Sequence, residues 1–265
     1  MAGSAPDRPT TESGWDRAGF VSFRQYLRAM ASAPGPSRLL ESDGLLAVIA
    51  PAAPDRSLFN SVLAIGAGSL ADAYEQLEST YEEAGVRAWT VWVPDDDRET
   101  AALLPERGHL LDGAPRSMAL ELTSLRRPER PPPPGMEIVP ASMRDVAAIN
   151  DAAYGIEEGG WSSAVDRMPP DLSIRARMAM LDGEAVSCAI VIDSGDDACV
   201  SAVATLPDHQ RKGLSAALLI DLLEDARDRG LRTGSLQASK AGAPVYERLG
   251  FADLGFIEMW ERRKA

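Results

Sequence analysis

The stretch LPDHQRKGLSAALL, residues 206–219, places two cations side by side at the predicted start of a helix. An apolar run ending at Thr205 precedes it. The first N–H groups of an α-helix have no intrahelical partner, and the helix dipole adds partial positive charge there. Gly213 lets a ligand approach the backbone closely, and Arg211 and Lys212 add charge. The stretch therefore predicts a diphosphate site; the alternative is a surface turn with two solvated cations.

Length and charge limit the classes of function. The chain has 265 residues, which suits one large domain or two of about 130 residues each. Hydrophobic residues make up 45%, enough for a sizeable core. The net charge of −13 repels nucleic acid and anionic membranes and mildly attracts cationic substrates. We therefore expect neither nucleic acid nor a membrane as a partner.

Cysteine and histidine content argues against a metal site. The two cysteines, Cys188 and Cys199, form no CxxC pair, and the two histidines lie far apart in the sequence. We expect both cysteines to be buried as small apolar residues. The polar N-terminus, 1–14, has no signal-peptide pattern, and no apolar run is long enough to span a membrane. The expected location is cytoplasmic.

A proline-rich segment, RRPERPPPPG at 126–135, is the clearest boundary in the chain. Prolines remove backbone donors and favour extended backbone, so this segment is typical of a semi-rigid linker. The predicted organisation is a loose tail over 1–14, a domain over 15–125, the linker, and a second domain over 136–265.

Hydrophobic periodicity predicts the same order of elements in both halves, which hints at a duplicated fold. Ser142 and Asp145 form a capping-box pattern, and Asp182-Gly183 is a two-residue hairpin signal. Helices are predicted over 15–31, 70–83, 99–106, 142–155, 214–229 and 243–249. Strands are predicted over 45–50, 58–65, 87–93, 117–123, 136–141, 173–181, 184–192, 198–205, 235–239 and 251–260.

Two motifs in the second half resemble those of a known family. Gln210 to Ser215 matches Gln/Arg-x-x-Gly-x-Gly/Ala between a strand and a helix, and Tyr246 to Phe251 matches a later Tyr-x-x-x-Gly-Phe. In this order they resemble the GNAT superfamily of acetyl-CoA-dependent N-acetyltransferases, over about residues 136–262. The pattern departs from the family at Ser215, Ser239 and Gly242, which stand where Gly/Ala, Asn and Ala are usual.

The resemblance implies the fold. The expected class is α/β (α+β), with tandem GNAT-like domains, each a mixed, mostly antiparallel sheet flanked by helices. Domain 15–125 would be a degenerate copy without a CoA cradle, and domain 136–265 the catalytic copy.

The resemblance also implies the roles of individual residues. The amides of residues 211–216 would hold the CoA diphosphate, and the backbone of 203–205 would pair with the pantetheine arm. Tyr246 would protonate the leaving thiolate; the alternative is a buried aromatic with a satisfied hydroxyl. Contact with acetyl-CoA, as co-substrate and without metal, is expected at Val203, Ala204, Thr205, Gln210, Arg211, Lys212, Gly213, Leu214, Ser215, Ala216, Ser239 and Tyr246.

A base is needed to deprotonate the acceptor amine. Glu157 and Glu158 lie on a loop that lines the acceptor side in the family, and we expect one of them to take the proton. Asp151 is a weaker candidate. Gly159, Gly160 and Trp161 would make this loop mobile, with an aromatic lid. An ordinary solvated acidic loop is an equally valid interpretation.

The first half contains a different motif. Gly66-Ala67-Gly68-Ser69-Leu70-Ala71 matches the dinucleotide fingerprint G-x-G-x-x-A. It does not follow the first strand of a repeating βαβ series, so we interpret it as a tight turn at a helix start. By position it is the counterpart of the turn at 210–215.

The favoured function is transfer of acetyl from acetyl-CoA to a primary amine, by direct attack, on a small-molecule and cationic acceptor. The first alternative is a non-catalytic acyl-CoA sensor. The second is a protein acetyltransferase acting on an N-terminus or a lysine, and the third an oxidoreductase that uses the Gly66 turn. A monomer and a homodimer are both compatible with the sequence.

Overall fold

A computed structural model describes most of the chain. The described residues are 19–31, 37–42, 44–64, 67–129, 131–157, 161–165 and 173–264. Their helices are α1 Gly19–Ala31, α2 Ala67–Glu83, α3 Arg98–Leu103, α4 Met143–Ala153, α5 Trp161–Val165, α6 Leu214–Asp228 and α7 Ala243–Leu249. None of them is long and apolar enough to cross a membrane. The predicted tail, 1–14, lies outside the described residues.

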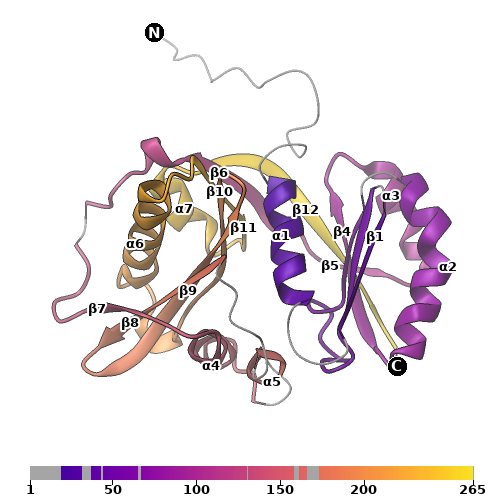
Figure 1. The fold of residues 1–265 in the computed structure, drawn as a ribbon, viewed down its shortest axis with the longest axis horizontal. Coiled ribbons are helices and arrows are strands. Elements are labelled where there is room, and N and C mark those ends of the chain that lie inside the picture. Colours follow the sequence, from indigo (N-terminus) through magenta and orange to yellow (C-terminus); the bar gives the residue numbers. More distant parts are fainter. Residues whose placement is uncertain are drawn as a thin grey trace, which may run out of the picture.

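The strands form one mixed sheet that runs through the whole molecule (Figure 1). In spatial order they are β1-β2-β3-β4-β12-β6-β11-β10-β9-β8-β7, with β5 paired to β12. Their bounds are β1 Arg38–Ser42, β2 Leu45–Ile49, β3 Ser61–Ala64, β4 Ala88–Pro94, β5 Leu110–Gly113, β6 Arg116–Glu121, β7 Glu137–Pro140, β8 Ile174–Leu181, β9 Glu184–Ser194, β10 Asp197–Thr205, β11 Thr233–Ala238 and β12 Ala252–Arg263.

The two halves repeat one pattern of pairing. In the first half β2 and β3 are antiparallel, β3 and β4 are parallel, and β4 pairs antiparallel with β12. In the second half β9 and β10 are antiparallel, β10 and β11 are parallel, and β11 pairs antiparallel with β6. The predicted fold class is thereby confirmed, and the shared order supports the predicted duplication.

The halves also exchange strands across the predicted boundary. β6 precedes the linker but pairs with β11 and the start of β12. β12 ends the chain, yet its second part pairs with β4 and β5. Figure 1 shows this yellow strand passing from one half into the other. The linker therefore separates the halves in sequence, whereas the sheet is continuous between them.

Helices cover both faces of the second-half sheet. Alternate residues of β9 point to opposite faces: Ala189 and Val191 pack with α6 and α7, whereas Cys188 and Ile190 pack with α4 and α5. Exposed and buried positions do not alternate along β9, because helices cover both faces of the sheet. Cys188 and Cys199 are buried and unpaired, as predicted.

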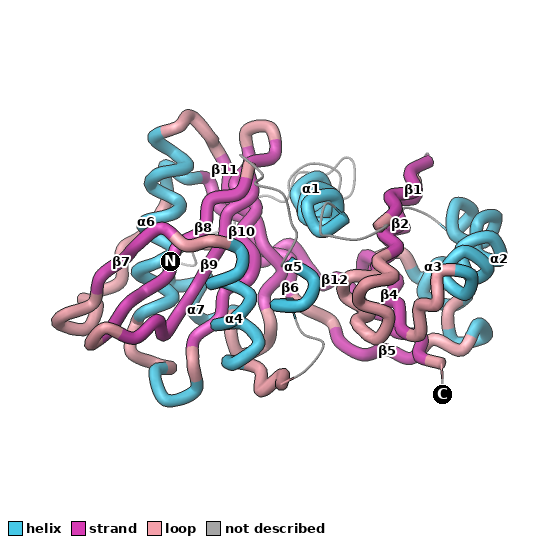
Figure 2. Tube along the Cα trace, turned by 60° about the horizontal axis from the view of Figure 1, so that its bottom comes forward, coloured by secondary structure: helices cyan, strands magenta, loops and turns pink. Residues whose placement is uncertain are grey.

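Helix α1 belongs to both halves. Phe23 and Leu27 pack against β2, β3 and β4 of the first half, while Tyr26 and Ala29 join the second-half core beside α4 and α5. Figure 2 shows α1 between the two groups of strands. Helix α1 thus contributes side chains to the cores of both halves.

Several local predictions are confirmed. Ser142 and Asp145 form the capping box at the start of α4. Asp182 and Gly183 both have positive φ, as a type I′ hairpin turn requires. The strand predicted over 58–65 is shorter, because turns occupy residues 57–60 before β3 begins.

Candidate functional site

Two neighbouring strands of the second half separate part-way along their length. β10 and β11 are paired in parallel only from Asp197 and Thr233 to Cys199 and Ser235. Beyond this point β10 continues beside β9 to Thr205, and β11 continues beside β6 to Ala238. The facing edges of β10 and β11 are therefore open to a ligand from Ser201 onward.

A β-bulge lies in β10 where the strands separate. Ser201 opposes Ile190 and Ala204 opposes Cys188, so three steps on β10 match two on β9. Ala202, within the bulge, has a φ of 49°, which is unfavourable for a residue with a Cβ atom. Bulges of this kind redirect backbone groups, and this one lies where the pairing of β10 with β11 has ended.

The turn after β10 supplies free backbone donors. Gly213 precedes α6 with a φ of 86°, and a Cβ built on it meets nothing within 4 Å. In the part of the chain that the structure describes, the amides of Leu214, Ser215 and Ala216 donate no backbone hydrogen bond. These amides lie at the positive end of α6 and are available to an anion.

One cavity of about 880 Å³ joins the strand opening to this turn, a size typical of small-molecule sites. Among its lining residues, all within the described part of the chain, none is acidic, although the protein has 40 Asp and Glu residues. Of the residues expected to contact the co-substrate, the lining includes Val203, Ala204, Thr205, Gln210, Arg211, Gly213, Leu214, Ser215, Ala216, Ser239 and Tyr246. Lys212 follows Arg211 but is not part of the lining.

Positive charge gathers around the cavity. Arg127, Arg211 and Arg248 line it, from the linker, the turn and α7. Arg127 is paired with Glu224, whereas Arg211 and Arg248 have no ion pair with another described residue. Unpaired arginines around a cavity without carboxylates favour an anionic ligand.

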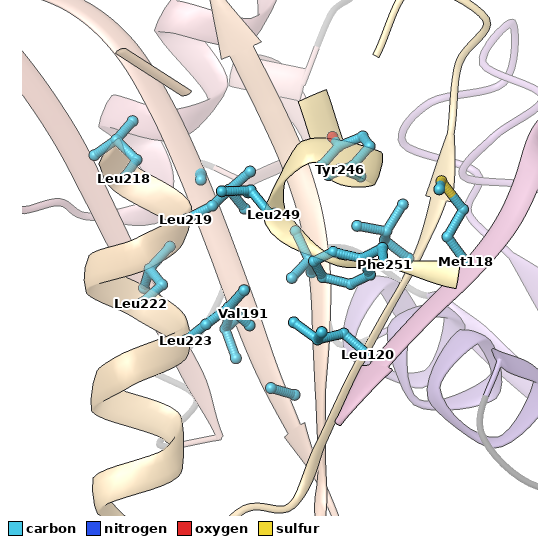
Figure 3. Packing of buried hydrophobic residues seen from close by; sticks show 14 of the residues in the cluster. Met118, Leu120, Val191, Leu218, Leu219, Leu222, Leu223, Tyr246, Leu249 and Phe251 are labelled. Carbon is cyan, nitrogen blue, oxygen red and sulfur yellow. The ribbon is translucent and has the colours of Figure 1, made fainter. Parts of the chain in front are cut away.

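Tyr246 lies where α7 meets the cavity. Its ring packs on Phe251 with 5.9 Å between centroids, and the side chain is buried at the edge of the core cluster (Figure 3). Burial raises the pKa of the Tyr246 phenol, so the group stays protonated at neutral pH. A Cβ on Gly242 would lie 3.2 Å from the Tyr246 ring, so glycine at this position leaves room for the ring.

The predicted acidic residues are placed differently. Glu157 is exposed and does not line the cavity, and Glu158 lies outside the described residues. The Asp151 carboxylate accepts hydrogen bonds from the Trp161 amide at 2.8 Å and from the Ser162 amide at 2.9 Å, so it caps α5.

The predicted aromatic lid is wrong at Trp161. Trp161 begins α5 and is buried against Phe59 of the first half, with 5.7 Å between ring centroids. Burial of the indole, together with the Asp151 cap, orders this part of the predicted loop. Gly159 and Gly160 lie outside the described residues.

Other lining residues have no signal in the sequence. Tyr154, at the end of α4, is 65% exposed and faces the same cavity as Tyr246. His209, Arg127, Pro128, Pro131 and Pro132 also line it. His209 adjoins Gln210 in the turn, whereas Arg127, the prolines and Tyr154 approach the site through the tertiary fold, so no local spacing marks them.

Residues 176–253 match the family model described as Acetyltransferase (GNAT) domain. The second half contains a GNAT acetyltransferase domain. This match includes the strand opening, the turn, α6 and Tyr246. A comparison with curated proteins found no match.

Solved structures share the fold over nearly the whole chain. A GCN5-related N-acetyltransferase from Kribbella flavida is 19% identical with a TM-score of 0.69, covering 94% of this chain and 96% of that one. A tandem GNAT protein from the clavulanic acid biosynthesis pathway is 14% identical with a TM-score of 0.58, covering 90% and 94%. A functionally unknown protein from Staphylococcus epidermidis is 14% identical with a TM-score of 0.62, covering 87% and 95%. The predicted tandem GNAT fold is confirmed.

Among the described residues of the first half, none before the linker lines the cavity. Residues 67–71 of its glycine motif form the start of α2, and Gly66 lies outside the described residues. A dinucleotide-binding half needs several parallel strands, whereas β3 and β4 are the one parallel pair among its described strands. The topology therefore favours a GNAT-like turn over a dinucleotide site.

Proposed function

We propose that the protein is an N-acetyltransferase that moves acetyl from acetyl-CoA to a primary amine of a small molecule. The observation that carries the proposal is the cavity of the GNAT domain, which combines an open strand edge, free helix amides and arginines with no carboxylate. These features fit the three parts of a CoA thioester: the pantetheine amides, the diphosphate and the sulfur end. The net charge of −13 favours an acceptor that is cationic when free.

Acetyl-CoA supplies an acyl group on a sulfur leaving group. The amides of α6 and Arg211 hold the diphosphate, and the β10 edge orients the pantetheine arm. A bond forms between the amine nitrogen and the acetyl carbon, the carbon–sulfur bond breaks, and Tyr246 gives its proton to the sulfur. The proton lost by the amine passes to solvent. A proton from solvent then returns to the Tyr246 oxygen and restores the phenol.

Release of free CoA thiol in the presence of a panel of small cationic amines tests the proposal. We expect turnover with at least one member of the panel and none with acetyl-CoA alone. Binding of acetyl-CoA without turnover on any small amine or on peptide N-termini and lysines would contradict an enzymatic role.

One observation favours a second candidate, a non-catalytic acyl-CoA sensor. The described cavity lining contains no carboxylate that could take the proton of an attacking amine. In a sensor, Tyr246 would only pack against Phe251, and its replacement by phenylalanine would leave the response to acyl-CoA unchanged. The same thiol-release measurement separates the two candidates.

A further inference from the structure

The proline-rich linker forms one wall of the cavity. Arg127, Pro128, Pro131 and Pro132 line it, although the sequence marks this segment as a connection between halves. Figure 1 shows the segment between η3, Leu122–Ser124, and β7 passing along the α6 side of the second half. The linker is thus part of the site.

Specific contacts hold the start of the linker in this place. The Arg126 amide donates to the carbonyl of Leu249, at the end of α7, at 2.9 Å. The Arg127 guanidinium donates to the two carboxylate oxygens of Glu224, on α6, at 2.6 and 2.7 Å. The segment is therefore fixed to both helices that flank the cavity before its prolines begin.

The start of the linker lies well along α6 from the free amides, because Arg127 is bound to Glu224, which follows Leu214 by ten residues. The cavity lining also includes Ala217 and Ile220 of α6 and Val245 and Arg248 of α7. Ile220 follows the free amides of 214–216 by about one turn. The proposed sulfur end lies at Val203 and Tyr246, whereas Arg127 is held at Glu224, about two helical turns beyond Ala216, so we place the linker at the end remote from the sulfur. This remote end is apolar and carries arginines, which suits a flat base attached to phosphates.

We propose that the linker is a specificity element that recognises the nucleotide end of the co-substrate, with Pro131 and Pro132 packing on the adenine base. This inference rests on the proposed function, because it assumes that the cavity binds a CoA thioester. Proline rings present a rigid apolar surface without an N–H group, and their restricted backbone loses little entropy on binding. The contact would select CoA thioesters over shorter pantetheine thioesters.

Calorimetric titration with two ligands and two variants tests the inference. The ligands are acetyl-CoA and acetyl-4′-phosphopantetheine, which lacks the nucleotide. One variant carries Pro131→Ser and Pro132→Ser. The matched control carries Pro133→Ser and Pro134→Ser, two prolines of the same linker that do not line the cavity. Thermal unfolding of each variant verifies that it is folded.

We expect the Pro131→Ser, Pro132→Ser protein to bind acetyl-CoA about 10-fold more weakly and acetyl-4′-phosphopantetheine as the unmodified chain does. The control should bind both ligands unchanged. Equal losses for the two ligands, or no loss for acetyl-CoA, would overturn the inference while leaving the proposed function intact. Absence of acetyl-CoA binding by the unmodified chain would overturn the proposed function, and the inference with it.

Discussion

Tyr246 is the residue on which the proposed chemistry depends. Its phenol is protonated and borders the cavity, which fits the proposed role of proton donor to the sulfur of acetyl-CoA. Loss of a general acid typically reduces rate by 10²- to 10⁴-fold. Tyr246→Phe should therefore lower kcat by about 100-fold and change the Kd for acetyl-CoA by less than about 2-fold, measured by thiol release and calorimetry.

Tyr81→Phe is a suitable control, because the Tyr81 hydroxyl donates to the Val48 carbonyl at 3.0 Å inside the first-half core. We expect it to lower stability by about 1 kcal/mol and to leave kcat unchanged. A Tyr246→Phe enzyme with unaltered kcat would show that another group, or solvent, protonates the thiolate.

His109 sets a pH dependence of stability in the first half. Its Nδ1 donates to the Trp260 carbonyl at 3.0 Å, and its Nε2 accepts from the Tyr74 hydroxyl at 2.9 Å. Burial lowers the pKa of this imidazole from 6.5 to about 4. Below pH 6.5 the unfolded chain binds a proton that the folded chain excludes, so the free energy of unfolding should fall between pH 6.5 and 4, by about 2 to 3 kcal/mol.

Urea unfolding at pH 7, 6 and 5 measures this loss. His109→Gln can keep both hydrogen bonds but does not titrate, so its stability should change less over the same range. If the free energy of unfolding falls equally with pH in the unmodified chain and in His109→Gln, groups other than His109 cause the loss of stability.

For single residues, the sequence predicts much of the cavity lining, because many of these residues follow one another along the chain. Gly213 and the residues after it form a turn whose geometry is local, so a short motif describes it. Tyr154 and Pro131 reach the same cavity from distant segments, and no periodicity or spacing encodes that approach. Asp151 is a candidate base by its position in the sequence, but in the structure its carboxylate caps α5.

Helix α6 is the element that we propose binds the diphosphate, and charge at its first turn should affect folding and binding in opposite directions. An aspartate in place of Ser215, the second helical residue, would interact favourably with the helix dipole. It would also repel the diphosphate from the free amides. Ser215→Asp should leave thermal stability equal or raise it by about 0.3 to 1 kcal/mol, while acetyl-CoA affinity falls at least about 10-fold.

Ser215→Ala separates charge from loss of the hydroxyl. It keeps every backbone donor, so we expect acetyl-CoA affinity within about 3-fold of the unmodified chain. If Ser215→Asp binds as tightly as Ser215→Ala, the diphosphate does not lie at the start of α6.

Elements with a buried face were predicted well, whereas two exposed strands and one short helix were missed. α6 and β9 carry continuous apolar patterns that match their burial. β1 and β5 were missed because most of their residues are exposed, which leaves no alternation to recognise. α5 was missed because it is short and depends on Asp151 and Phe59 for its position.

For the whole molecule, the exchange of β6 and β12 makes each half structurally incomplete. A fragment of residues 130–265 would lack β6 between β11 and β12, and a fragment of 1–129 would lack β12 beside β4. Both would expose unpaired strand edges and lose shared core. We expect neither fragment to show cooperative unfolding alone, and their coexpression to restore a folded complex, as measured by circular dichroism and gel filtration.

An autonomously folded 130–265 fragment would contradict this account of the sheet. The exchange itself was not predictable, because partners such as β6 and β11 are separated by most of the second half. Propensity and periodicity describe each strand, but they do not specify which distant strand it pairs with.

The most direct measurement is a calorimetric titration of the full chain with acetyl-CoA. We expect one site per chain with affinity on the order of micromolar, about −8 kcal/mol, because one described cavity combines free amides, arginines and an open strand edge. Two sites per chain would mean that the first half also binds the ligand. No binding at millimolar acetyl-CoA would contradict the central claim that this GNAT domain is built to hold a CoA thioester.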